Sequence, residues 1–262
     1  MMWPFAASFA AMLVTISPAQ IDHAIDSGRI DQARLMIAHA IEEGAAPASL
    51  EPSLARIAYK SGAFEEALAR GEGMLGASPD DPAVNELVGL SALALGKDER
   101  ALRALAKATA SPTTSWRAWN GLGVVADRSG DFGEARAAYA HALALAPTRA
   151  EIVNNLGWSY FLAGDLKAAL PFFERAVAAD PRSPLFAANR DLVLTALAAD
   201  LPPRKPREDD ETYAARLNDL GVVALSLHQR RKAIAAFSQA IAVRGEYYGR
   251  AVNNLRSAEG AK

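Results

Sequence analysis

The 262-residue chain contains no cysteine. This absence excludes disulfides, thiolate nucleophiles, cysteine-based zinc sites and acylation at a lipobox cysteine. It leaves the redox compartment open, because a chain without cysteine is compatible with any compartment.

Aromatic residues are also scarce, at 7% of the chain, although hydrophobic residues reach 51%. The apolar content is therefore mostly small and aliphatic, which favours closely packed helices over a sheet rich in β-branched and aromatic side chains. The net charge is small too, at −2. Without a basic excess to hold a phosphate backbone, we expect no nucleic-acid partner.

No hydrophobic run reaches the roughly 20 residues that a membrane-spanning helix needs. One shorter apolar run extends from Phe5 to Ile16, and Ser17 and Ala19 then supply small residues at the −3 and −1 positions of a possible cleavage site. No Lys or Arg precedes this run. Residues 1–19 are therefore either an export signal or weak membrane anchor, or a buried first helix. We expect a periplasmic or exported protein in the first case and a cytoplasmic one in the second.

What the chain does contain is an internal repeat. Glycines recur at intervals of 34 residues, and an alanine follows five positions after each of them. The glycines are Gly28, Gly62, Gly96, Gly130 and Gly164. Since glycine occupies only about 7% of positions in an average protein, five in register indicate a true period. Periods of this length are typical of repeat architectures.

Each period has the pattern of helix, turn and helix, most clearly around Gly130. Trp119 and Gly123 lie on one face of a predicted first helix, which Gly130 ends by allowing a positive φ. The second helix carries Tyr139 and stops before Pro147. We expect glycine or alanine to let the two backbones approach, with the Tyr139 ring filling the gap between them.

The pattern W-x2-L-G-x2-A, then G, then A-x3-Y-x2-A and P resembles the signature of the tetratricopeptide repeat (TPR) family. The periods that begin near Arg117 and Glu151 match it closely, and the resemblance covers most of the chain. It implies an all-α fold, an α-solenoid of stacked antiparallel helix pairs that winds into a right-handed superhelix.

The register changes in the last third of the chain. A first helix is predicted over Phe186–Leu197, and residues 200–210 follow as a proline-rich charged stretch that cannot be helical throughout. A further repeat carries His228 in place of the turn glycine, and a capping helix begins near Ala251. We expect the solenoid over residues 20–199 and a C-terminal repeat with its cap over 211–262. Residues 200–210 are either a long loop or a hinge.

No catalytic motif accompanies the repeats. The histidines fall in different repeats, and the sequence contains no H-E-x-x-H, no G-x-S-x-G and no phosphate-binding glycine loop. We therefore expect no enzyme activity, no cofactor and no metal site.

The TPR resemblance implies a concave groove lined by particular positions of the first helices. In this chain those positions hold Arg117, Asn120, Asp127, Asn154, Asn155, Trp158, Phe161, Asn189, Asn218, Asn253 and Asn254. A carboxamide both donates and accepts, so a row of asparagines can pair with a peptide backbone, while Trp158 and Phe161 add apolar anchors. The alternative is that the asparagines are ordinary exposed or capping residues and that Trp158 is buried against the next repeat.

The resemblance therefore implies a non-catalytic scaffold that binds a protein or peptide segment. Within the family, the chain is similar to the TPR proteins of bacterial Tad (Flp) pilus assembly clusters through Trp119–Val124, Tyr139–Pro147 and Ile152–Gly157. That similarity implies a role in pilus or secretion assembly, although this chain lacks the acylated cysteine that such proteins often carry. The alternatives are an RNA-binding helical-repeat protein and a regulatory scaffold of a larger complex.

Overall fold

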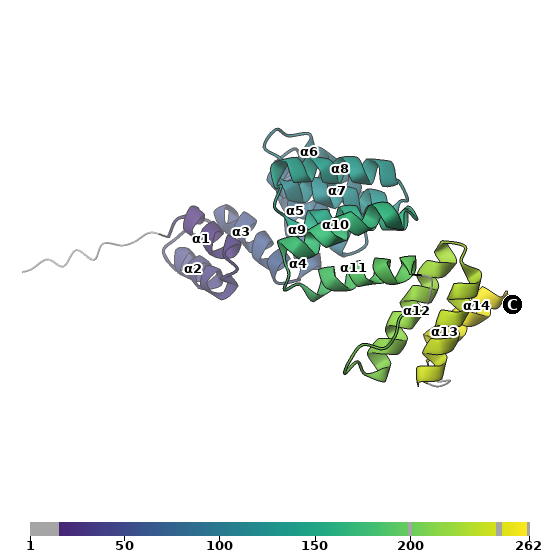
Figure 1. Cartoon of the computed structure of the whole chain (residues 1–262). Coiled ribbons are helices and arrows are strands. Elements are labelled where there is room, and N and C mark those ends of the chain that lie inside the picture. The colour runs from purple at the N-terminus through teal and green to yellow at the C-terminus, as the bar shows by residue number, and fades with distance from the viewer. Residues whose placement is uncertain (1–15, 199–200, 245–247, 261–262) are drawn as a thin grey trace, which may run out of the picture. The chain divides into compact units, whose positions relative to one another are not determined.

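The computed structural model describes residues 16–198, 201–244 and 248–260, and within these ranges it contains fourteen helices and no strand (Figure 1). The predicted all-α fold of antiparallel helix pairs is confirmed. Residues 1–15, which include all of the apolar run Phe5–Ile16 except its last residue, lie outside the described residues. No described helix combines the length and the apolar character needed to cross a membrane.

The chain forms two compact units, unit 1 over residues 1–114 and unit 2 over residues 115–262. The boundary lies within the stretch expected as one solenoid, and the 200–210 loop belongs to unit 2 together with the repeat that follows it.

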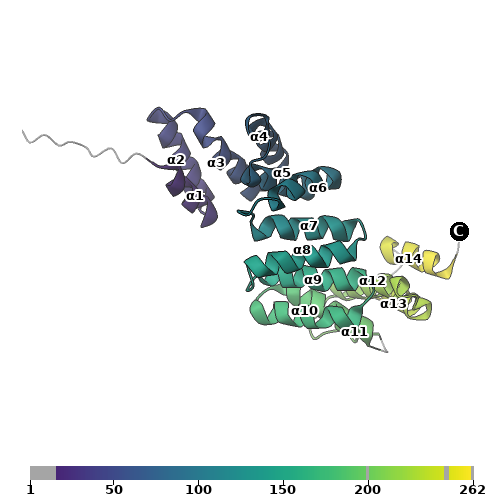
Figure 2. The ribbon, with the colours of Figure 1, turned by 90° about the horizontal axis from the view of Figure 1, so that it is seen from above.

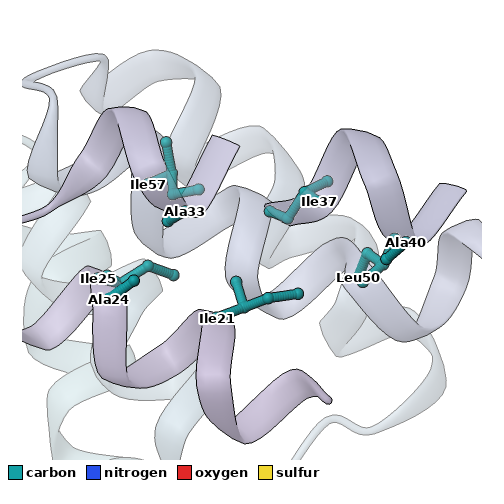
Figure 3. Packing of buried hydrophobic residues seen from close by; sticks show 8 residues of the cluster. All are labelled: Ile21, Ala24, Ile25, Ala33, Ile37, Ala40, Leu50 and Ile57. Atoms are coloured by element: carbon teal, nitrogen blue, oxygen red, sulfur yellow. The ribbon is translucent and has the colours of Figure 1, made fainter. Parts of the chain in front are cut away.

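Unit 1 contains three helix pairs. They are α1 (Pro18–Asp26) with α2 (Ile30–Glu42), α3 (Pro47–Lys60) with α4 (Phe64–Ala77), and α5 (Pro82–Ala94) with α6 (Asp98–Thr109). Helices α1 to α3 enclose an aliphatic core in which Ile21, Ile25, Ile37 and Leu50 are buried (Figure 3). Aliphatic packing suits these early periods, which lack the aromatic position of the later ones.

The start of α1 has a defined cap. The Ser17 hydroxyl accepts from Gln20 N, and the Gln20 side chain accepts from Ser17 N at 2.8 Å, which together form a capping box. Cleavage after Ala19, the position suggested by the sequence, would remove this cap and the first two residues of the helix.

Unit 2 contains three further pairs and two single helices. The pairs are α7 (Trp116–Arg128) with α8 (Phe132–Leu145), α9 (Ala150–Leu162) with α10 (Leu166–Ala179), and α12 (Asp210–Ser226) with α13 (Arg230–Arg244). The single helices are α11 (Pro184–Leu197) and α14 (Gly249–Glu259). Figure 2 shows α7 to α11 side by side in chain order. The helix predicted over Phe186–Leu197 is confirmed as α11.

Glycine and an aromatic ring meet where the two helices of a pair come closest. A Cβ added to Gly123 would lie 2.5 Å from the Tyr139 ring, and one added to Gly157 would lie 3.0 Å from the Phe173 ring. Both rings are fully buried. Any larger residue would push the helices apart, so the packing expected from the sequence is confirmed.

In unit 2 the two single helices carry a charge where the paired first helices carry glycine. Asp191 of α11 lies 34 residues after Gly157, and Arg256 of α14 follows the same Val-Asn-Asn-Leu sequence that precedes Gly157. Asp191 pairs with Lys205 of the following loop, and Arg256 is exposed. In unit 2, therefore, a charge in place of the glycine coincides with a first helix that lacks a second one.

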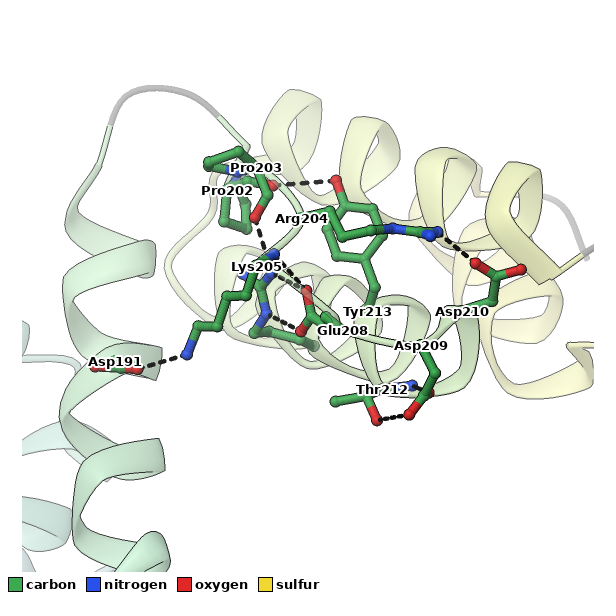
Figure 4. Close-up of polar contacts among 11 residues, drawn as sticks. Asp191, Pro202, Pro203, Arg204, Lys205, Glu208, Asp209, Asp210, Thr212 and Tyr213 are labelled. Atoms are coloured by element: carbon green, nitrogen blue, oxygen red, sulfur yellow. Dashed lines mark hydrogen bonds and ion pairs between the residues drawn. The ribbon is translucent and has the colours of Figure 1, made fainter.

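The loop after α11 is ordered by side chains of α12 (Figure 4). Tyr213 donates from its hydroxyl to Pro202 O at 3.1 Å, and Arg216 donates to Pro203 O at 2.9 Å. Arg216 also pairs with both carboxylate oxygens of Glu208, at 3.0 and 2.8 Å, in a pair whose side chains are only 17% and 5% exposed. Bidentate pairing of this kind fixes geometry as well as charge.

The same loop is tied to α11. Lys205 Nζ lies 2.7 Å from Asp191 Oδ2, and Arg190 lies 2.8 Å from the other oxygen of that carboxylate. These two cations hold the pKa of Asp191 below its ordinary value, although burial opposes them. Residues 202–208 therefore contact both α11 and α12.

Candidate functional site

Four of the predicted asparagines form one continuous hydrogen-bonded chain. Asn189 Nδ2 donates to Asn154 Oδ1 at 2.7 Å, Asn154 Nδ2 to Asn155 Oδ1 at 3.4 Å, and Asn155 Nδ2 to Asn120 Oδ1 at 3.1 Å. This amide chain (Asn189, Asn154, Asn155, Asn120) crosses α11, α9 and α7. It therefore links successive first helices of the stack.

The same relation recurs at the C-terminal end of unit 2. Asn254 Nδ2 of α14 donates to Asn218 Oδ1 of α12 at 2.9 Å. Asn218 Nδ2 lies 3.5 Å from Asp219 Oδ1, and Asn253 is exposed. The pairing is interrupted between α11 and α12, where the repeat register changes.

Burial divides the asparagines into two groups. The exposed fractions of Asn154, Asn189 and Asn218 are 4%, 6% and 6%, whereas Asn120 and Asn155 are half-buried. Buried amides pay a large desolvation cost unless they are paired, and here they pair with one another. A peptide backbone can reach the buried three only by breaking these bonds, so Asn120 and Asn155 are the members of the amide chain open to a partner.

The aromatic residues predicted for the groove lie together on α9. The Trp158 and Phe161 rings meet edge to face with centroids 4.7 Å apart, and Trp158 also packs against Phe173 of α10 at 5.8 Å. Both Trp158 and Phe161 are half-buried. Leu162, which sequence reasoning did not single out, follows them with 51% of its surface exposed. We call Trp158, Phe161 and Leu162 the apolar patch.

The apolar patch and the open amides share one side of α9. Asn155, Trp158 and Leu162 are three and four residues apart, a spacing that places side chains on the same face of a helix. The bond from Asn155 brings Asn120 of α7 beside them. We call these five residues (Asn120, Asn155, Trp158, Phe161 and Leu162) the first-helix face.

Arg117 lies at the start of α7, three residues before Asn120. Its guanidinium group lies 4.8 Å from the centroid of the Trp116 ring, and that of Arg149 lies 5.0 Å from the same ring. The cation–π contact holds Arg117 near the helix end. Arg117 is therefore placed at the margin of the first-helix face rather than within it.

Asp127 lies deeper, between the helices. Tyr139 donates from its hydroxyl to Asp127 Oδ2 at 2.9 Å. Burial raises the pKa of the Asp127 carboxyl above its ordinary value, and burial together with this carboxylate raises the pKa of Tyr139. Asp127 thus belongs to the packing of α7 on α8. In the described part of the chain, no group of three His, Asp or Glu side chains is placed to hold a metal ion.

Two stretches of the chain match family models described as tetratricopeptide repeat, residues 19–82 and residues 117–182. They span the pairs α1–α2, α3–α4, α7–α8 and α9–α10 and both glycine–aromatic contacts described above. The chain is a tetratricopeptide-repeat protein. No curated protein sequence matches it.

Solved structures show the same repeat fold. A thermophilic TPR protein from Thermus thermophilus is 23% identical, with 67% of this chain and 96% of that one covered and a TM-score of 0.55. The MamA protein of AMB-1 is 25% identical, with 63% and 98% covered and a TM-score of 0.50. A chain of the APC/C hetero-tetramer Cut9–Hcn1 is 15% identical and has a TM-score of 0.55. The match covers 92% of this TPR protein and 42% of that chain.

The family assignment settles the general class of function. A TPR solenoid is a protein–protein interaction scaffold, and TPR proteins are generally non-catalytic. Its helices stack against near neighbours and leave long surfaces for a partner.

Proposed function

We propose that this TPR protein binds a segment of a partner protein on the first-helix face of unit 2. The observation that carries the proposal is the apolar patch, where Leu162 is half exposed beside two half-buried aromatic rings. Aromatic anchors of this kind dominate the energetics of protein interfaces. The amides of Asn120 and Asn155 lie beside the patch and supply hydrogen-bonding groups.

The expected affinity is modest. Burying the exposed half of one leucine side chain contributes about 1 kcal/mol, given roughly 1.5–3 kcal/mol for a whole one. Two or three such side chains contribute about 2–3 kcal/mol, whereas a micromolar complex needs about 8 kcal/mol, so the neighbouring amides and further surface must supply the rest. The surface therefore suits a reversible scaffold.

Partner capture from the native host extract tests this proposal. Wild-type protein is compared with Phe161→Ala/Leu162→Ser and with the control Leu145→Ser, which alters a similarly exposed leucine on the second helix α8. We expect the wild type and the control to retain the same partners and the double variant to lose them. Identical partners on all three proteins, with unchanged helicity, would rule out the first-helix face.

A narrower hypothesis concerns the cellular role. The motifs shared with TPR proteins of Tad (Flp) pilus clusters support a partner from pilus or secretion assembly, and the apolar N-terminal run supports export to the periplasm. Fractionation with N-terminal sequencing tests the second point. We expect a periplasmic protein that has lost its first residues, whereas an intact cytoplasmic chain would exclude export.

A further inference from the structure

A hollow of about 790 Å³ opens in unit 2, beside the turn that follows α9. It is lined by the turn between α9 and α10 (residues 164–167), the end of α11 (196–198) and the turn between α12 and α13 (227–232). The two turns are close because α11 has no second helix to separate them. A Cβ added to Gly164 would lie 3.9 Å from the Leu227 side chain.

The lining of this hollow carries an excess of positive charge. Its ionised side chains are Lys167, Arg230, Arg231, Lys232 and Asp165. With four cations and one carboxylate, the local formal charge is +3, in a chain whose net charge is −2. Such a concentration of charge attracts anionic groups and raises their local concentration.

Two of the cations already have internal roles. Arg230 donates to Ala258 O and Glu259 O at 2.6 Å each, at the C-terminal end of α14. Lys232 donates to Ala196 O at 2.9 Å, at the end of α11. Cations at helix C-termini complement the helix dipole, so these two are structural.

The other two cations are available. Lys167 and Arg231 are exposed, and in the part of the chain that the structure describes neither makes an ion pair or a hydrogen bond through its side chain. Asp165 Oδ1 accepts from Ala168 N at 3.0 Å and caps α10, and its one negative charge offsets at most one of the four cations. Two uncompensated cations therefore face one hollow.

Part of the lining is apolar. Leu166 is buried, Leu227 is half-buried and Leu197 is 40% exposed. An aliphatic side chain of a ligand can cover Leu197, while acidic side chains of the same ligand pair with the cations. This mixture suits a peptide better than a nucleic acid, whose phosphates need a longer run of cations.

We propose that this hollow is a second docking site, specific for an acidic segment of a partner protein. Carboxylates of the segment pair with Lys167 and Arg231, and one aliphatic side chain packs against Leu197 and Leu227. The cations that bind the segment are none of the residues of the first-helix face, although both surfaces rest on the apolar cluster around Leu166. Two separate surfaces on one solenoid would let the scaffold hold two partner segments together.

Fluorescence anisotropy with a labelled peptide of six glutamates around a central leucine tests the site. At about 50 mM salt we expect measurable binding to the full chain, weakened at least about tenfold by Lys167→Glu/Arg231→Glu and also by 0.5 M salt. The matched control is Lys60→Glu/Lys97→Glu in unit 1, which makes the same change in net charge at exposed residues outside the hollow. Leu162→Ser, which alters only the exposed member of the apolar patch, should bind the peptide as the wild type does, which separates this site from the first-helix face.

Three results would overturn the proposal. The first is no binding up to 1 mM peptide. The second is equal weakening by the control pair. The third is displacement of the peptide by inorganic phosphate or by a short single-stranded RNA more readily than by an unlabelled copy, which would assign the hollow to a phosphate ligand. Far-ultraviolet circular dichroism of each variant confirms that the helices are intact.

Discussion

Asn189 of α11 donates a 2.7 Å hydrogen bond to Asn154 of α9, and both side chains are more than nine-tenths buried. This bond joins the first helices of two successive repeats. Polar pairing inside the stack, alongside apolar packing, therefore helps to set their alignment.

Asn154→Ala should destabilise unit 2 by about 1–3 kcal/mol, because it leaves the buried Asn189 amide without its acceptor. Denaturant unfolding measures the effect. As the control, Asn253→Ala alters an exposed asparagine on α14 and should change the free energy of unfolding by less than about 0.5 kcal/mol. Equal effects of the two substitutions would show that the amide chain contributes nothing to stability.

Gly123→Ala and Gly73→Ala should have opposite effects. The new methyl group at residue 123 meets the Tyr139 ring, which we expect to cost about 1–3 kcal/mol. The one at residue 73, inside α4, meets nothing within 4 Å and should stabilise by about 0.5–1 kcal/mol through helix propensity. Thermal unfolding followed by circular dichroism distinguishes them, and destabilisation by both would contradict the close approach specific to Gly123.

His228→Gly should stabilise the turn between α12 and α13. His228 has a φ of 58°, where the corresponding turn residue Gly164 has 81°. A left-handed conformation costs a non-glycine residue about 1 kcal/mol, so we expect a gain of that order, reduced by the greater freedom of glycine in the unfolded chain. A melting temperature below that of the wild type would show that the His228 side chain makes a compensating contact.

The Glu208–Arg216 pair should make stability depend on pH in the acidic range. The hydrogen bonds from Arg216 lower the pKa of Glu208 below its ordinary value of 4.5, and burial partly opposes them. A lowered folded-state pKa gives stability that is fully present above 4.5 and is lost as the pH falls through the lower folded value. Glu208→Gln removes this contribution.

Urea unfolding of the wild type and of Glu208→Gln between pH 3 and pH 6 measures the pH-dependent contribution of Glu208 to stability. We expect the wild type to be the more stable protein at pH 6, and the difference to shrink as the pH falls. A difference that stays constant over this range would mean that Glu208 does not titrate with folding.

Much of the fold was predictable because each repeat has the same pattern of residues at its helix contacts. The 34-residue spacing located the turns, and Gly123 with Tyr139 indicated a helix crossing. In unit 2 the charges at Asp191 and Arg256 stand at the glycine position of the two unpaired helices, and this difference is visible in the sequence. Local pattern therefore decides which helices form and how each pair packs.

The site was less predictable. Sequence spacing placed Asn154 and Asn155 on one helix face, but it cannot tell which amide points to the next repeat, because that depends on how far successive helices are offset. The hollow was also not predictable, because it too depends on how the helices pack. Gly164 and His228 are 64 residues apart in sequence and become neighbours only because α11 lacks a second helix. The offset between successive repeats depends on tertiary packing, which local residue patterns do not specify.

Photocrosslinking in living cells shows whether a partner protein lies against the first-helix face. Benzoylphenylalanine is introduced in place of Leu162 on the first-helix face and, as the control, in place of Leu145 on α8. We expect a protease-sensitive, nuclease-resistant adduct from position 162 and none from position 145. Adducts from position 145 alone, or nuclease-sensitive adducts from position 162, would contradict it.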